Sequence, residues 1–251
     1  MPTRYDQRNA RLDALEATYA PRIRAALVRQ AASAIARLEQ LDTLTPVTAD
    51  LLAALIRPDR LLPVLEALYV ACGTVEAADT YDWLTEGMKA QAPPGVRDSW
   101  AGRLRRFIST EGAAAVRGIT DTTRGIVRRV LNESATAGHG IAEAARNLRA
   151  EVATLARSRS VVIARTELLT AANYSSLMGA QATGLRLEKF WLATPDGRTR
   201  QSHRNADGQG APLQDGFFSV GGFQARYPAD PMLPASERCA CRCSVGYRVP
   251  A

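Results

Sequence analysis

The sequence feature that most constrains the fold is a change of pattern at Gly184. Before it, apolar residues recur at spacings of three and four along long segments, as on one face of an α-helix. After it, short apolar runs alternate with glycine and proline, which is typical of strands and turns. Of the 251 residues, 46% are hydrophobic but only 6% aromatic, which favours helices packed through small side chains. We therefore predict a mainly α protein with a helical N-terminal platform and a small C-terminal α+β unit.

The chain divides into three regions on sequence grounds. Residues 1–92 form an N-terminal helical region, residues 93–183 a basic helical region, and residues 184–251 the α+β unit. We place a hinge at Pro93-Pro94-Gly95, because two prolines and a glycine interrupt a helix. The expected helices cover residues 4–42 (one helix, or two with Pro21 opening the second), a short segment capped by Thr48 and ended by Pro58, and 61–69, 74–89, 96–110, 113–130, 141–155 and 158–183.

The last region predicts short elements in a defined order. Residues 187–193 are expected to form a strand, Pro195-Asp196-Gly197 a tight turn, and residues 198–205 a short helix. Residues 217–227 predict a hairpin around Gly221-Gly222, and residues 242–249 a final strand. Gly184 itself is expected to end the preceding helix as its C′ residue.

The formal net charge of +7 is distributed unevenly. The three segments 1–92, 93–160 and 161–251 carry net charges of −2, +6 and +3, and arginine supplies nearly all of the basic excess. Such a surface is compatible with double-stranded DNA or an acidic partner, bound without sequence specificity and in a salt-sensitive way. Solvated helix faces are the alternative. The candidate contact residues are Arg105, Arg106, Arg128 and Arg129.

Membrane insertion and secretion are not expected. No apolar run approaches the roughly 20 residues that a membrane span requires, and the N-terminus lacks the apolar core of a signal peptide. We expect synthesis in the cytoplasm, where a disulfide framework is unusual. The cysteines are then expected to bind metal or to pack.

Zinc is the first chemistry to consider. His203, Cys239, Cys241 and Cys243 are the candidate ligands, since thiolate and imidazole are the preferred donors of a tetrahedral zinc site. In the alternative interpretation the cysteines are small buried groups that pack a loop-rich unit. No other cofactor is indicated.

A catalytic site is the second kind of chemistry that the C-terminal residues could support. Asp196, Arg198, His203 and Asp207 are close in sequence and compatible with a metal-dependent nuclease or hydrolase. However, the sequence supplies no recognisable nucleophile, phosphate loop or paired carboxylates. In the structural alternative, Asp196 caps the following helix and His203 packs against the strand of Trp191. We predict that the protein is not an enzyme and assign no catalytic residue.

Arg165 and Glu167 stand two residues apart within a helical segment. Residues at this spacing project from different faces, so each needs a partner elsewhere. We expect one or both to tie this helix to the C-terminal unit, where Asp196, Asp207, Arg198 and Arg200 offer opposite charges.

An ordered series of residues between about 160 and 248 resembles the Mu-F family of phage minor head (head morphogenesis) proteins. The series comprises Arg165-Thr166-Glu167, Asn173, Phe190-Trp191, Asp196-Gly197-Arg198, His203, Asp207-Gly208, Phe217, Tyr227-Pro228, Asp230, Glu237 and Cys241-Arg242-Cys243. The resemblance implies a structural minor head protein of a tailed phage or prophage, made in the host cytoplasm and carried in the virion at the portal vertex or capsid interior. It implies a portal protein and a major capsid protein or scaffold as partners, head morphogenesis as the role, and DNA packaging or ejection as an extension of it.

This interpretation leaves two others open, a metal-dependent nuclease or hydrolase and a sequence-independent DNA-binding accessory protein. Under the resemblance, Arg165, Glu167, Trp191, Asp196, Arg198 and Asp207 are structural residues.

Overall fold

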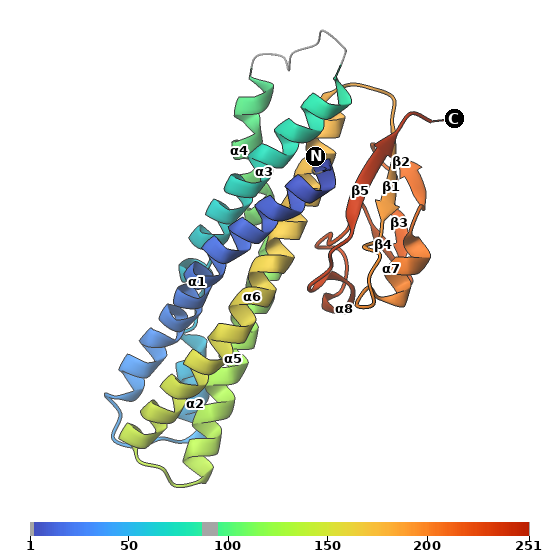
Figure 1. The fold of residues 1–251 in the computed structure, drawn as a ribbon. Coiled ribbons are helices and arrows are strands. Elements are labelled where there is room, and N and C mark those ends of the chain that lie inside the picture. The colour runs from blue at the N-terminus through green and yellow to red at the C-terminus, as the bar shows by residue number, and fades with distance from the viewer. Residues whose placement is uncertain (1–2, 87–94, 251) are drawn as a thin grey trace. The chain divides into compact units, whose positions relative to one another are not determined.

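The computed structural model describes residues 3–86 and 95–250, and these residues form long helices followed by a small sheet-containing region (Figure 1). The helices are α1 (Arg4–Leu38), α2 (Pro46–Ala54), the 3-10 helix η1 (Pro58–Arg60), α3 (Leu62–Leu84), α4 (Val96–Ser109), α5 (Ala113–Thr136), α6 (Ile141–Ala182), α7 (Gln201–Ala206) and α8 (Ala235–Arg238). The strands are β1 (Glu188–Leu192), β2 (Gly210–Pro212), β3 (Phe218–Val220), β4 (Phe223–Ala225) and β5 (Ser244–Arg248). The predicted fold class, mainly α with a small C-terminal α+β unit, is confirmed.

The chain folds into two compact units, each assembled from separate stretches of sequence. Unit 1 comprises Met1–Glu16, Glu66–Glu111 and Arg165–Ala251, and unit 2 comprises Ala17–Leu65 and Gly112–Ala164. The three consecutive regions predicted from the sequence stay a prediction, and the proposed break at Pro93-Pro94 lies outside the described residues.

Two predicted helix interruptions do not occur, and of the two alternatives left open for residues 4–42 the single helix is the one observed. Pro21 lies inside α1, and the segments 61–69 and 74–89 are joined as α3, whose described helix ends at Leu84. The segments 141–155 and 158–183 are likewise joined as α6. Tertiary packing overrides the local preference against helix, because buried side chains continue along the helix at these points. Tyr19 and Ile23, for example, are buried on either side of Pro21.

The start of α2 differs from the predicted one by three residues. Thr45 is the N-cap and accepts a hydrogen bond from the Thr48 amide, while the Thr48 side chain accepts one from the Thr45 amide. This reciprocal capping box satisfies two amide groups that have no partner within the helix. Pro58 does not end α2 directly but opens η1.

Unit 2 is a helical bundle with its own core. Apolar side chains from α1, α2, α5 and α6 meet there, and many of them are alanine. The buried members are Ala31, Ala34, Leu38, Ala49, Leu52, Ala53, Ile56, Val127, Val130, Leu131, Ala144, Ala145, Leu148 and Val152. The predicted packing through small side chains is present in this core.

The C-terminal part of unit 1 contains two small antiparallel sheets. One has the strand order β2-β1-β5, with Trp191 opposite Val245, and the other is the β3-β4 hairpin with Val220 opposite Phe223. Gly221 and Gly222 both adopt positive φ in the hairpin turn, which explains the glycine pair. Gly184, with φ of +69°, follows the end of α6 as predicted.

Trp191 and Phe218 are central to the core of this part. Both are fully buried, and their rings meet edge to face with centroids 5.5 Å apart. Leu169 and Leu177 of α6 belong to the same hydrophobic cluster, so the sheet-containing region packs directly on this helix. Cys241 and Cys243 are also members of the cluster.

One segment, Pro58–Leu84, is long and apolar enough to cross a membrane, with a mean hydropathy of 1.5 over its most apolar window. Core helices of soluble proteins pass the same test, so one such helix is weak support for a span. Within it, Glu76 is buried and forms ion pairs with Arg8 and Arg11 of α1. A buried ion pair of this kind is typical of a helix packed against protein.

Candidate metal centre and its polar supports

Three of the four predicted metal ligands converge in unit 1. His203 projects from α7, while Cys241 and Cys243 lie in the segment between α8 and β5. The His203 Nδ1 atom lies 3.3 Å from the Cys243 Sγ and 3.6 Å from the Cys241 Sγ. All three ligand atoms lie within 4.8 Å of one another, and all three side chains are buried.

The fourth predicted ligand, Cys239, is not part of this cluster among the described residues. Its carbonyl accepts a hydrogen bond from Arg200, and Ala240 then adopts a left-handed φ of +52°. This turn separates Cys239 from Cys241, so the alternating cysteines do not all point to one place. The Ala240 amide is held by the Thr166 hydroxyl at 3.0 Å.

Glu237 supports the histidine and was not predicted as a site residue. Its Oε2 atom lies 3.1 Å from the His203 Nε2 and accepts a hydrogen bond from the Ser202 hydroxyl at 2.7 Å. The His203 ring also packs edge-on against Trp191, with centroids 5.5 Å apart, which confirms the predicted contact. Histidine ligands of metals are commonly oriented by a carboxylate in this way.

The two clustered thiols differ in acidity. Hydrogen bonding from Cys241, followed by contact with His203, lowers the pKa of Cys243 to about 5. The same interaction with Cys243, together with burial, raises the pKa of Cys241. Burial also raises the pKa of Cys72, which lies far from the cluster in α3. All four cysteines are free thiols.

The Arg165-Thr166-Glu167 motif lies in α6. It holds the segment between α8 and β5 that carries Cys241 and Cys243, called the cysteine segment below, against this helix. Glu167 is buried and accepts hydrogen bonds from Arg238 at 2.7 Å and from the Tyr69 hydroxyl at 2.8 Å. Arg165 instead pairs with Glu16 of α1 at 2.8 Å. The expected link between this helix and the C-terminal region is therefore present through Glu167, but its partner is Arg238 rather than Arg198 or Arg200. Neither aspartate named in the prediction, Asp196 or Asp207, pairs with Arg165.

Asn173, two turns further along α6, fixes the backbone of the same segment. Its Nδ2 donates to the Cys243 carbonyl at 3.0 Å and to the Pro228 carbonyl at 2.9 Å. Its Oδ1 accepts from Arg8, which also contacts Ser244 and the buried Glu76. Asn173 of α6 thus satisfies backbone carbonyls of this region, and Arg8 of α1, itself paired with Glu76 of α3, holds the Asn173 side chain in place.

The Asp196 turn is built differently from the predicted helix cap. Asp196 accepts hydrogen bonds from the Arg198 amide at 2.9 Å and from Arg242, which lies between the two clustered cysteines. The bond from Arg242 lowers the pKa of Asp196 to about 2. The N-cap of α7 is Arg200, and within the described structure no side chain caps it. Asp207 accepts from the Ala193 amide at 2.8 Å and so joins the end of β1 to α7.

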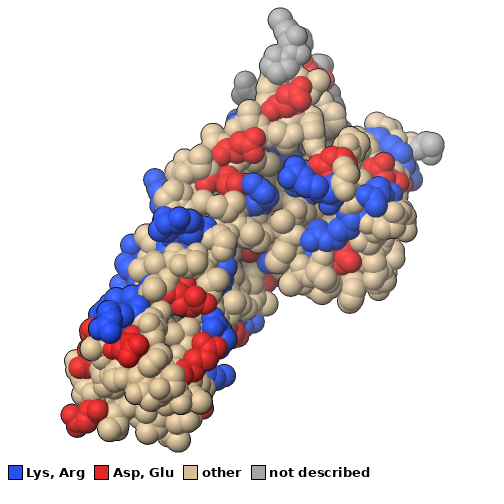
Figure 2. All heavy atoms as spheres, turned by 60° about the horizontal axis from the view of Figure 1, so that its bottom comes forward, with Lys and Arg blue, Asp and Glu red and all other residues tan. Residues whose placement is uncertain are grey.

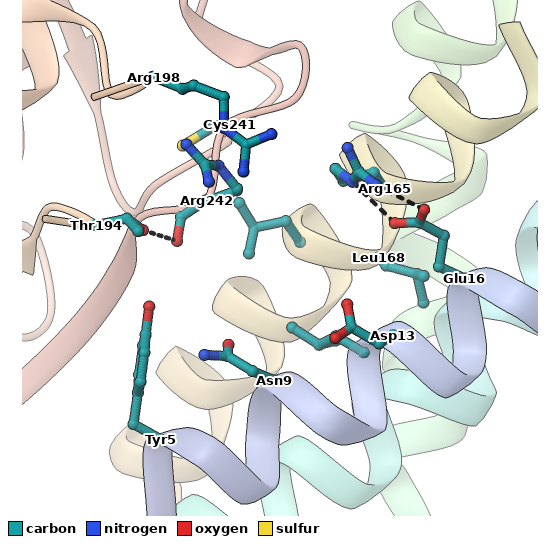
Figure 3. Close-up of a pocket in the computed structure, with 12 residues that line it drawn as sticks. Tyr5, Asn9, Asp13, Glu16, Arg165, Leu168, Thr194, Arg198, Cys241 and Arg242 are labelled. Carbon is teal, nitrogen blue, oxygen red and sulfur yellow. Dashed lines mark hydrogen bonds and ion pairs between the residues drawn. The ribbon is translucent and has the colours of Figure 1, made fainter. Parts of the chain in front are cut away.

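A pocket of about 340 Å³ opens beside this corner within unit 1 (Figure 3). Asp13 and Glu16 of α1 line one wall, and Arg198 and Arg242 line the opposite one. Cys241, which is buried, is among the residues that line this pocket, and the pocket is large enough for water. The pocket places opposite charges face to face.

Lys189 is a buried residue that sequence reasoning passed over. It lies in β1 beside the Phe218 ring, and its Nζ has no hydrogen-bond partner among the described residues. Burial, followed by repulsion from Arg226, lowers the pKa of Lys189 to about 8. Its only sequence signal is a lysine at an inward position of a predicted strand.

The four candidate DNA-contacting arginines are divided between the two units. Arg105 belongs to unit 1 and pairs with Glu66, while Arg128 belongs to unit 2 and pairs with Asp50. Arg129 contacts Glu133 and Glu151, and Arg106 is exposed. On the face that Figure 2 shows, basic and acidic side chains are interspersed.

The sequence that builds the corner of α6, α7 and the cysteine segment is similar to that of a known protein family. Residues 125–246 match the family described as "Phage Mu protein F like protein". The matching part is just under half of the chain and runs from α5 through α6 into β5. The resemblance inferred from the sequence is confirmed.

Two curated relatives share part of this region. The minor head protein GP7 of Bacillus phage SPP1 is 30% identical over 124 residues, which cover 48% of this chain and 39% of that protein. The NAD(+)--arginine ADP-ribosyltransferase EFV of Enterococcus faecalis is 33% identical over 110 residues, covering 43% of this chain and 22% of that protein. The match therefore spans well under half of either relative. No solved structure matched the chain.

Proposed function

We propose that the protein is a structural minor head protein of a tailed phage or prophage and acts in head morphogenesis. The observation that carries this proposal is the similarity to a minor head protein in the region where α6 supports the cysteine segment. The virion is the location proposed with it, at the portal vertex or the capsid interior. DNA packaging or ejection is a further role consistent with such a place.

An exposed apolar stripe on α2 supports a function in protein assembly. Val47, Leu51 and Leu55 are 70%, 65% and 40% exposed, and their spacing of four places them on one helix face. Leu55 also borders a groove of about 620 Å³ in unit 2, together with Arg29, Arg57, Arg60 and Asp59. Three cations beside one anion favour an acidic, amphipathic partner segment, which we assign to the portal protein.

The experiment is assembly in the phage or prophage that encodes the chain. Nuclease-treated heads are purified and the protein is quantified, with wild type compared with the Val47→Asp/Leu51→Asp variant. We expect the wild-type chain in the heads at low copy number, and loss of both its incorporation and its association with co-expressed portal protein in the variant. Val249→Asp is the matched control, since Val249 is 76% exposed but lies outside α2.

Absence of the folded wild-type chain from heads would refute the structural function. Normal incorporation of the α2 variant would leave that function standing and refute the assigned surface. A major capsid protein or scaffold is the alternative partner, and co-expression of each with the chain separates it from the portal protein.

We assign no catalytic function to this chain. The name of the Enterococcus relative describes an activity of that protein, of which only 22% is matched here. A metal-dependent nuclease or hydrolase would require metal-dependent turnover that His203→Ala abolishes, and we expect none. A DNA-binding accessory function would require salt-sensitive duplex binding lost on substitution of Arg105, Arg106, Arg128 and Arg129. The carboxylate partners of three of these arginines reduce the charge available to phosphate.

A further inference from the structure

We propose that unit 1 binds one Zn²⁺ ion through the Nδ1 atom of His203 and the Sγ atoms of Cys241 and Cys243, with water as the fourth ligand. This inference is independent of the proposed head function. It concerns a site that joins α7 to the segment leading into β5. Its role is to hold these two elements together from inside the core.

The distances between the donor atoms fit a tetrahedral ion. Zinc bonds of about 2.3 Å to sulfur and about 2.0–2.1 Å to nitrogen, at the tetrahedral angle, separate sulfur from nitrogen by about 3.6 Å. The observed separations of Nδ1 from the two Sγ atoms are 3.6 Å and 3.3 Å. The two nitrogen–sulfur separations are therefore within a few tenths of an ångström of the value that the ion requires, and all three donor atoms lie within 4.8 Å of one another.

The chemistry of the donors selects the metal. Two thiolates and one imidazole favour zinc, whereas calcium and magnesium take oxygen ligands. Sulfur and ring nitrogen are also weak hydrogen-bonding partners for each other, so three such groups converging in a core gain little without an ion. The carboxylate of Glu237 at the opposite ring nitrogen, Nε2, is positioned to orient His203 toward the ion.

The fourth position distinguishes this site from a cysteine-rich structural knuckle. Among the described residues, the cluster holds only these three donors, and Cys239 lies outside it. Cys241 is among the residues that line the pocket of about 340 Å³ in Figure 3, and we assign the water ligand to this side of the cluster. Three protein ligands and one exchangeable ligand follow from this arrangement.

Zinc content and ligand identity are measured on the full chain, purified under reducing conditions without chelators. Elemental analysis is expected to give one zinc per chain. X-ray absorption at the zinc edge is expected to show two sulfur ligands at about 2.3 Å and two nitrogen or oxygen ligands at about 2.0–2.1 Å. Three sulfur ligands would refute the open position and restore Cys239 as a ligand, and a folded reduced chain without zinc would refute the site.

Variants separate the ligands from nearby cysteines. Cys243→Ser and His203→Ala are expected to lose stoichiometric zinc, whereas Cys239→Ser and Cys72→Ser are expected to keep it. Since a ligand variant can fail to fold, Glu237→Gln provides an independent test that leaves all three donors in place. We expect it to weaken zinc binding by about 10–100-fold in competition with a chromophoric chelator. Unchanged affinity in folded Glu237→Gln, or zinc loss in Cys239→Ser, would contradict the assigned set.

Discussion

Substitution of Arg238 by methionine tests the central polar link between α6 and the C-terminal region. Arg238 donates to Glu167 at 2.7 Å, and the two residues are 8% and 1% exposed. Burial alone would lower the pKa of Arg238, but the adjacent Glu167 carboxylate raises it, so Arg238 stays charged. Removing the arginine leaves a buried carboxylate whose remaining partner is the Tyr69 hydroxyl.

The expected cost of Arg238→Met is about 3–5 kcal/mol in the free energy of unfolding, because an unpaired buried charge remains. Adding Glu167→Gln removes that charge while keeping an acceptor for Tyr69. The double variant should therefore recover about 2 kcal/mol or more of the loss. Urea unfolding followed by circular dichroism measures all three proteins.

Arg165→Met is the matched control on the same helix. Its pair with Glu16 is 44% and 19% exposed, so its loss should cost no more than about 1 kcal/mol. A cost below about 1 kcal/mol for Arg238→Met, or no recovery in the double variant, would refute a buried ion pair that fixes this corner.

Two further substitutions test single features. Lys189→Met should stabilise the protein by about 1–3 kcal/mol at pH 7, because it removes a buried ammonium without a hydrogen-bond partner. The pKa of Lys189 is lowered to about 8 from 10.5, so the wild type becomes more stable as the pH rises between these values. The stability advantage of the variant should therefore shrink over this range. A constant advantage in urea unfolding from pH 8 to 10.5 would contradict the assignment. Thr45→Ala should cost about 1 kcal/mol by removing half of the α2 capping box, measured as faster hydrogen exchange at the first amides of α2.

Periodicity predicted where helices lie but not where they are continuous. The three- and four-residue spacing is a local signal, and it identified the helical segments and the change at Gly184. Pro21 left one helix or two open over residues 4–42, and the predicted helices 61–69 and 74–89 were kept apart although α3 is continuous between them. Continuity came from tertiary packing, since neighbouring buried residues such as Ile23 keep the helix in place.

The residue types of the metal-ligand cluster could be predicted from the sequence, but its exact membership depends on tertiary structure. His203, Cys241 and Cys243 were candidates on residue type alone, since histidine and cysteine are rare in this chain. Excluding Cys239 required the left-handed backbone of Ala240, and finding Glu237 required a contact across 34 residues. The link from Glu167 to the C-terminal region was expected, but its partners Arg238 and Tyr69 lie 71 and 98 residues away and were not identified, nor were the backbone partners of Thr166 and Asn173.

Close helix packing leads to a last prediction, in which one substitution has opposite effects at two helical glycines. A Cβ atom added to Gly179 of α6 would lie 2.3 Å from the Ala77 carbonyl oxygen of α3, so the two backbones must move apart. Gly118 of α5 has nothing within 4 Å of the same position. We expect Gly179→Ala to cost about 1–3 kcal/mol through overpacking, and Gly118→Ala to add about 0.5–1 kcal/mol by reducing the freedom of the unfolded chain. Urea unfolding of the two variants distinguishes contact from propensity, since helix propensity alone would make both substitutions stabilising. Stabilisation by Gly179→Ala would therefore show that α3 and α6 do not approach each other as closely as their small residues indicate.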